Sequence, residues 1–146
     1  MAATSDNADF IAACQRVLAR LQKNCDGLQW VGLTSRDGME IVSTHHESHE
    51  KLSVMGGTLQ ALADGIAHEA TIGGCHDIII GAQNGRFIVL SVRDRANRLV
   101  IAGLTTERTS LGLALALFSA CCREIAALAD SPPVQTPVHT LYNPVG

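Results

Sequence analysis

CHDIIIGAQNGRFIVL, residues 75–90, joins two apolar segments through an Asn-Gly pair. The two segments are joined around Asn84-Gly85, a pair that is a good signal for a hairpin. This region therefore predicts three successive strands, at residues 75–81, 86–92 and 98–104. The three isoleucines at 78–80 make both faces of the first strand apolar, so we expect the sheet to be covered on both sides.

A second hairpin is predicted upstream, in VGLTSRDGMEIVST, residues 31–44. Its turn is Arg36-Asp37-Gly38, and its two strands cover residues 28–35 and 39–44. Apolar residues three and four positions apart predict helices at about 8–23, 50–69 and 109–129. Candidate N-caps of the first helix are Asp6, Asn7 and Asp9.

The last helix is capped in this prediction by Thr109 or Ser110, and it is apolar nearly all round until Arg123. We therefore expect it to be deeply buried. The full order is α-β-β-α-β-β-β-α, which predicts an α/β sandwich of the profilin-like kind, with a mainly antiparallel five-stranded sheet between helices. We expect one domain over residues 1–130 and a proline-containing tail over 131–146, which is either a solvated arm or a peptide that binds a partner.

Composition narrows the classes of function. The chain has 146 residues and a formal net charge of −3, so it has no basic footprint for nucleic acid. Aromatic residues are only 3% of the chain, which predicts an aliphatic core. The start shows no secretory signal pattern, and the apolar run 111–122 is shorter than the roughly 20 residues that span a bilayer. We expect a cytoplasmic protein without membrane insertion.

Histidines and cysteines are the candidate reactive groups. HHESHE, residues 45–50, contains His45, His46 and His49, but their spacing selects no metal-binding pair and no third ligand is fixed by sequence. A polar loop before the helix is our interpretation. Five cysteines, without a C-x-x-C motif, indicate buried thiols rather than disulfides. We therefore predict no catalytic, cofactor-binding or metal-binding residues.

In its order of hairpins and helices the chain resembles the roadblock / dynein-light-chain family, particularly its single-domain bacterial members. The resemblance is carried by residues 31–44, by 78–90, and by the strand 99–105 running into Ser110-Leu-Gly-Leu113. It implies a non-enzymatic dimer in which the third strand pairs with its copy and the second helices pack side by side. It also implies a platform for Ras-like small GTPases, whose GTP hydrolysis some bacterial relatives stimulate.

The residues themselves fit such a dimer. An apolar edge strand invites aggregation, and pairing with a second copy removes the edge. We expect the row Leu52, Met55, Leu59, Leu62 and Ile66 to cover the sheet. The small residues of the same helix, Gly57, Ala61 and Gly65, would then face the second subunit. Alternatively, both rows face the core of the monomer. The candidate interface residues are His76, Ile78, Ile80, Met55, Gly57, Leu59, Ala61, Leu62 and Gly65.

Two other functions remain open from the residues. A profilin-like sandwich could sense a small molecule, held between the sheet and a helix. Less favoured is an enzyme that uses the Cys121-Cys122 thiols or a metal held by the histidines at 45–49. No phosphate-binding loop is present, so any GTP belongs to a partner, and arginines near turns, such as Arg36, are candidates to act on it in trans.

Overall fold

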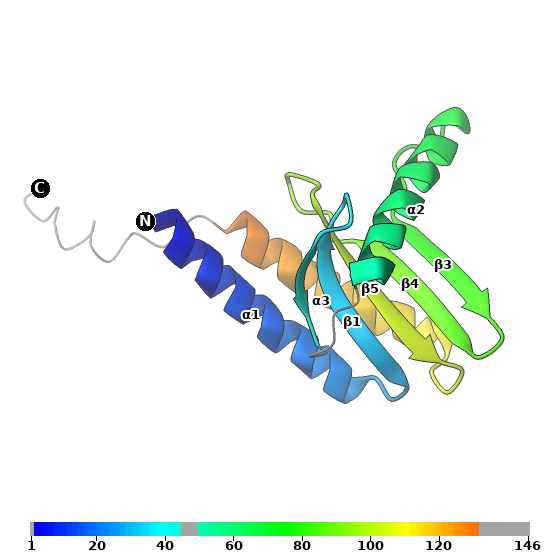
Figure 1. Cartoon of the computed structure of the whole chain (residues 1–146), viewed down its shortest axis with the longest axis horizontal. Helices are drawn as coiled ribbons and strands as arrows, with labels where there is room; N and C mark the ends of the chain where they lie inside the picture. Colours follow the sequence, from blue (N-terminus) through cyan, green and yellow to red (C-terminus); the bar gives the residue numbers. More distant parts are fainter. Residues whose placement is uncertain (1, 45–49, 132–146) are drawn as a thin grey trace, which may run out of the picture.

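A computed structural model describes residues 2–44 and 50–131, with side chains from residue 7 onward. The predicted order of elements is confirmed (Figure 1). The helices are α1 (Ala2–Asn24), α2 (Glu50–Glu69) and α3 (Leu111–Asp130). The strands are β1 (Leu28–Ser35), β2 (Glu40–Ser43), β3 (Asp77–Ala82), β4 (Gly85–Ser91) and β5 (Leu99–Thr106). The histidines at 45–49 and the tail from residue 132 lie outside the described residues.

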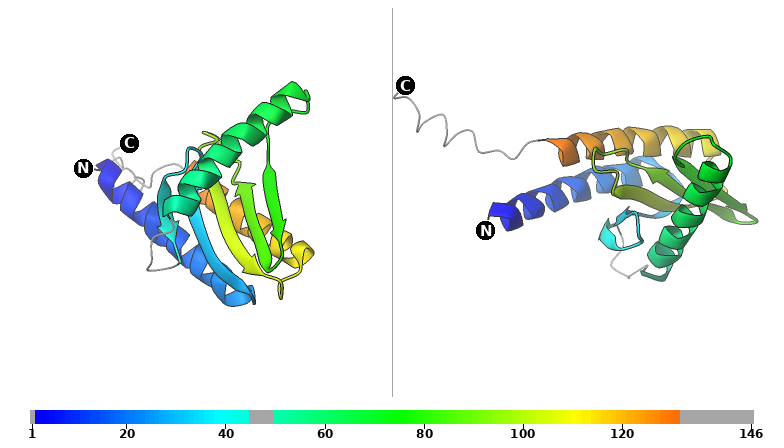
Figure 2. Two further views of the ribbon diagram at one scale, coloured as in Figure 1. Left: turned by 45° about the vertical axis from the view of Figure 1, so that its right-hand side comes forward. Right: turned by 90° about the horizontal axis from the view of Figure 1, so that it is seen from above.

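The five strands form one sheet in the order β2-β1-β5-β4-β3, and every neighbouring pair is antiparallel. Helices α1 and α3 cover one face of this sheet, and α2 crosses the other (Figures 1 and 2). The predicted α/β sandwich is therefore confirmed. Among the described strands, β3 lies at one edge of the sheet.

The larger part of the core lies between the sheet and the pair α1 and α3. It is mainly aliphatic, as the composition predicts, with Phe118 as its one fully buried aromatic ring. A Cβ on Gly103 of β5 would lie 2.5 Å from that ring, so glycine makes room for Phe118 at the centre of the sheet. The fully buried aliphatic residues here include Leu18, Leu33, Ile88, Ile101 and Ile125.

The smaller part of the core lies on the α2 face of the sheet. Its buried members are Trp30, Val89, Val100 and Ala102. The side of α2 that is buried carries small or polar residues, Ser53, Gly57, Gln60 and Ala67. The predicted packing of α2 is therefore wrong, because the row that contains Met55, Leu62 and Ile66 points away from the sheet.

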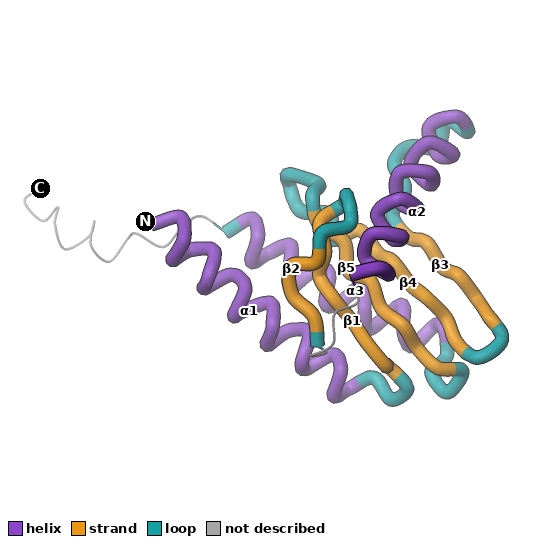
Figure 3. Tube along the Cα trace, viewed as in Figure 1, coloured by secondary structure: helices purple, strands orange, loops and turns teal. Residues whose placement is uncertain are grey.

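The turn between β1 and β2 explains how α2 is oriented. Gly38 has a φ of +99°, and a Cβ there would lie 2.8 Å from the Ser53 carbonyl oxygen. A Cβ on Gly57 would lie 2.6 Å from the carbonyl carbon and oxygen of Asp37. The turn lies beside the first turns of α2 (Figure 3), and the backbones of the two segments are in direct contact there. Gly38 in the turn and Gly57 in the helix permit this close approach, because neither has a side chain.

An ion pair holds the second half of α2. Arg36 Nη2 donates to both carboxylate oxygens of Asp64 at 2.9 Å. Asp64 Oδ1 also accepts from the Cys75 amide at 3.2 Å, which ties the α2–β3 connection to the same group. Arg36 is thus engaged in structure, and the backbone contact and this ion pair together set which side of α2 faces the sheet.

Two expectations about helix ends and burial change. The first helix begins at Ala2, so Asp6, Asn7 and Asp9 lie inside it and do not cap it. Ser110 is confirmed as the N-cap of α3, where its side chain accepts from the Leu113 amide at 3.2 Å. The expected deep burial of α3 is wrong, because only one side faces the core.

Within the described part of the chain, α3 is the one helix that meets the length and composition of a membrane span. Here Ala114, Phe118 and Ile125 are buried in the protein core. Core helices of soluble proteins satisfy the same criterion, so this property is weak evidence for a membrane role.

The contact between α2 and the turn predicts opposite effects at two adjacent glycines. We expect Gly57→Ala to lower the free energy of unfolding by about 1–3 kcal/mol, because its methyl group would overlap the Asp37 backbone. Gly56→Ala is the matched control, since its Cβ would meet only Phe87, at 3.8 Å. It should raise stability by up to about 1 kcal/mol through helix propensity. Urea unfolding at one protein concentration measures both, and equal effects would contradict the close contact.

Candidate interaction surface on α2 and β3

An exposed apolar row runs along the outer side of α2. Met55 is 60% exposed, and Leu62 and Ile66 are each 61% exposed. Val54 is 58% exposed beside Met55, while Leu59 is half-buried. Large apolar side chains exposed together in this way mark surfaces that other molecules cover. We call Val54, Met55, Leu59, Leu62 and Ile66 the outer row.

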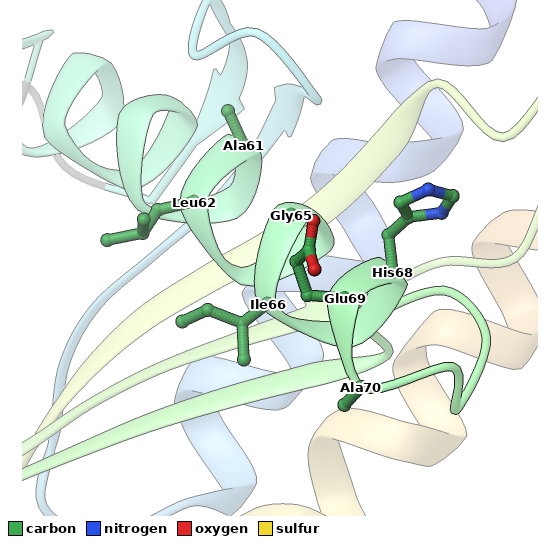
Figure 4. Close-up of a pocket in the computed structure, with 7 residues that line it drawn as sticks. All are labelled: Ala61, Leu62, Gly65, Ile66, His68, Glu69 and Ala70. Carbon is green, nitrogen blue, oxygen red and sulfur yellow. The ribbon is translucent and has the colours of Figure 1, made fainter.

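The second half of the outer row borders a shallow hollow of about 780 Å³. Leu62 and Ile66 extend to the same side of the helix, as the close-up shows (Figure 4). Ala61 and Gly65 contribute little side chain, which leaves the backbone of α2 open to close approach. His68 and Glu69 place polar groups at the end of the hollow. An apolar strip with a polar end is typical of a protein interface.

A second hollow continues the surface from α2 to β3. Its volume is about 410 Å³, and Ile66 belongs to both hollows. Ile72, in the connection between α2 and β3, lines it and is 76% exposed. Ile78 of β3 lines its opposite side. The apolar surface is therefore continuous from the helix to the edge strand.

The free edge of β3 completes this surface. Ile79 is 40% exposed and Ile80 is 44% exposed. Ile78 pairs with Val89 and therefore faces α2, while Ile79 pairs with Ile88 and faces the side of α3. The outer backbone of β3 has no neighbouring strand among residues 2–44 and 50–131. Such an edge is a template for a further strand.

Neither a scan of protein-family models nor a search of curated proteins finds a match. Solved structures do match. Myxococcus xanthus MglB superposes with a TM-score of 0.72 at 19% identity, over 80% of this chain and 94% of MglB. A structure described as MglB with tetrameric arrangement gives 0.73 at 12% identity, over 83% and 90%. A roadblock/LC7 domain from Streptomyces avermitilis gives 0.69 at 10% identity, over 76% and 92%.

The chain has the roadblock/LC7 fold. Acanthamoeba castellanii profilin IA is also similar, with a TM-score of 0.51 at 12% identity, over 77% of this chain and 96% of profilin. The profilin-like prediction of the fold is thereby confirmed. At these low sequence identities, the similarity establishes the fold and does not identify a partner.

The structure brings together most of the residues predicted from sequence for an interface. Met55, Leu62 and Ile80 are exposed on the surface just described. Ala61, Gly65 and His76 are also exposed, whereas Leu59 and Ile78 are half-buried. Gly57 is different, because it lies against the β1–β2 turn of its own chain. Residues that the predicted interface omitted are Val54, Ile66, Ile72 and Ile79.

Four of the five cysteines, Cys14, Cys25, Cys121 and Cys122, are buried. Burial raises the pKa of Cys14 to about 11 and is the main cause that raises the pKa of Cys121 and Cys122 to about 12. Burial is also the main cause that raises the pKa of Cys25. A nucleophilic thiol needs the opposite shift, because the thiolate is the reactive form. These four thiols are therefore protonated at neutral pH.

Metal ligands do not gather in the part of the chain that the structure describes, where no three His, Cys, Asp or Glu side chains could share an ion. His45, His46 and His49 lie outside that part, so the interpretation of these residues as a polar loop stays a prediction.

Arginines near turns, besides Arg36, also make contacts within the chain. Arg86 donates to the Thr109 carbonyl at 2.9 Å, and Arg108 lies 3.8 Å from Asp26.

Thiol labelling separates buried from accessible cysteines. With iodoacetamide at pH 8, we expect at most one thiol, Cys75, to react before the protein unfolds, because Cys75 is only half-buried. The other four should react once urea unfolds the chain, and intact mass spectrometry counts the additions. Rapid labelling of Cys121 or Cys122 in the folded protein would instead favour thiol chemistry.

Proposed function

We propose that this chain is a non-enzymatic, homodimeric scaffold that binds a Ras-like small GTPase or a related signalling partner in the cytoplasm of a bacterial cell. One observation carries the proposal: a roadblock/LC7 fold whose outer row on α2 runs continuously into a free, apolar edge strand. The sequence resemblance to single-domain bacterial roadblock proteins supplies the class of partner. Residues 1–130 form the scaffold domain in this proposal, and the tail over 131–146 is a further partner-binding candidate.

The dimer proposed here uses both parts of the surface at once. Strand β3 pairs with β3 of a second copy, so that the two sheets become one and the edge disappears. The outer rows of the two α2 helices then pack against each other, which removes Met55, Leu62 and Ile66 from water. Of the predicted interface residues, His76, Ile78, Ile80, Leu59, Ala61 and Gly65 remain in this proposal with Met55 and Leu62. Gly57 leaves it, because its own hairpin occupies that side of the helix.

Leu62 tests the dimer. We expect Leu62→Glu to convert a dimer at micromolar concentration into a folded monomer, because the carboxylate would have to enter an apolar interface. Leu113→Glu is the matched control, since Leu113 is 50% exposed on α3, which covers the opposite face of the sheet. It should remain dimeric. Size-exclusion chromatography with light scattering gives both masses, and a monomeric wild-type protein would contradict the proposal.

The GTPase partner is tested with purified proteins. The Ras-like GTPases encoded in the source genome would each be loaded with GDP or with a non-hydrolysable GTP analogue and passed over the immobilised dimer. We expect one of them to bind, and to bind more tightly in one nucleotide state, because a regulatory platform needs a difference in affinity between the two states.

Failure of every GTPase to bind a protein confirmed as dimeric would remove this class of partner. That result would leave the dimer itself in place, because the two experiments measure different contacts. The Leu113→Glu dimer serves as the control chain in the binding assay.

A further inference from the structure

A separate pocket lies on the other face of the sheet from the outer row. It has a volume of about 540 Å³, within the range of roughly 300–1,000 Å³ typical of small-molecule sites. Its lining comes from the end of β4, from the residues around the start of β3, and from α3. The outer row of α2 does not line this pocket, whereas His76 belongs both to its lining and to the proposed β3 interface.

The floor of the pocket is apolar. Leu90 of β4 and Val92, just after β4, are buried, and Leu115 and Ala126 of α3 line the pocket beside them. These side chains belong to, or pack against, the main core between the sheet and α3. An alkyl chain bound against these side chains would be removed from water, and the core would not have to rearrange.

Two arginines line the same pocket from different elements. Arg93 follows β4, and Arg123 lies on α3. Both guanidinium charges act on the Cys122 thiol and tend to lower its pKa, although burial dominates and raises the pKa to about 12. Cys122 is therefore neutral, so no thiolate offsets the positive charge of the two arginines.

Neither arginine has a hydrogen-bonded or ion-paired partner within the described residues, whereas Arg20, Arg36 and Arg108 each pair with a carboxylate. Asp77 is the acidic side chain that lines the pocket, so two arginines against one aspartate leave one net positive charge, with His76 counted as neutral. Ser119 adds a hydroxyl group to the lining. The pocket therefore offers donors to an anion next to an apolar floor.

The loop after β4 holds Arg93 in position. Arg93 has a φ of 64°, in the left-handed region that side chains other than glycine rarely adopt. Neighbouring bonds fix this conformation: the Val92 amide donates to the Leu99 carbonyl at 3.0 Å, and the buried Asp94 accepts from the Arg98 amide at 3.2 Å. A strained backbone conformation that neighbouring hydrogen bonds maintain is consistent with a binding role for Arg93.

We propose that this pocket binds a small amphipathic oxyanion, namely a carboxylate or phosphate group on a short alkyl chain. The guanidinium groups of Arg93 and Arg123 hold the oxyanion, and the apolar floor formed by Leu90, Val92 and Leu115 holds the chain. The proposal is independent of the GTPase partner, because it rests on a different face of the molecule.

Isothermal titration calorimetry with octanoate and octyl phosphate tests the proposal on the full-length protein. We expect at least one of them to bind, with octanol, acetate and inorganic phosphate each binding about tenfold more weakly or worse. The stronger of the two octyl compounds distinguishes a carboxylate ligand from a phosphate ester. Binding of neither one, or equal binding of octanol, would overturn the proposal.

The variant Arg93→Asn/Arg123→Gln locates the site, because asparagine tolerates the left-handed backbone and glutamine is a good helix former. It should weaken binding by about tenfold or more while its melting temperature without ligand stays near that of the wild type. Arg16→Gln is the matched control, since Arg16 is an exposed arginine of α1 outside the pocket. Equal weakening by Arg16→Gln would show that the ligand responds only to overall charge.

Ser119→Leu tests the pocket without changing charge. The larger side chain should fill part of the volume and weaken octyl binding to a similar extent. Unchanged affinity in this variant, with the protein folded, would place the alkyl chain elsewhere and overturn the site.

Discussion

The backbone contact between Gly57 of α2 and the Asp37-Gly38 turn determines which side of α2 faces the sheet. Helix and turn approach so closely that a single Cβ on either glycine would overlap backbone atoms. The Arg36–Asp64 ion pair adds a second point of attachment about two turns further along the helix. With two points fixed, the helix cannot rotate about its axis. Its small and polar residues face inward, and its large apolar residues face outward.

The two faces of the sheet consequently differ in kind. On the α1 and α3 face, long aliphatic side chains and Phe118 form the larger part of the hydrophobic core. On the α2 face, the buried cluster around Trp30 and Val89 is small. The turn contact and the ion pair hold α2 in place there, so the helix does not need to bury its own large residues. The domain can therefore present the apolar residues of α2 to another molecule without losing its core.

The elements of the fold were predictable because their signals are local. The Asp-Gly turn, the apolar strands and the Ser110 cap each depend on neighbouring residues, and they are confirmed. The second hairpin also forms, but its two-residue loop is Gln83-Asn84, because Gly85 already pairs with Ala82 in the sheet. The direction of α2 was not predictable in the same way. Periodicity identifies the row Met55, Leu62 and Ile66 but does not say whether that row faces the sheet or solvent. Deciding this requires the contact between Gly57 and Asp37 and the pairing of Arg36 with Asp64, which join positions far apart in sequence. The pocket with Arg93 and Arg123 was missed for the same reason.

The outer row and the β3 edge are two liabilities of an isolated monomer. Exposed Leu62 and Ile66 attract other apolar surfaces, and an open apolar strand such as 78–80 attracts other strands. Their continuity through the hollow lined by Ile66 and Ile78 means that one partner can cover both. A partner that bound α2 alone would leave the backbone of β3 open, whereas a second copy offers an identical strand and an identical row. Two-fold symmetry would then cover both surfaces at once, which is the physical reason for the proposed dimer.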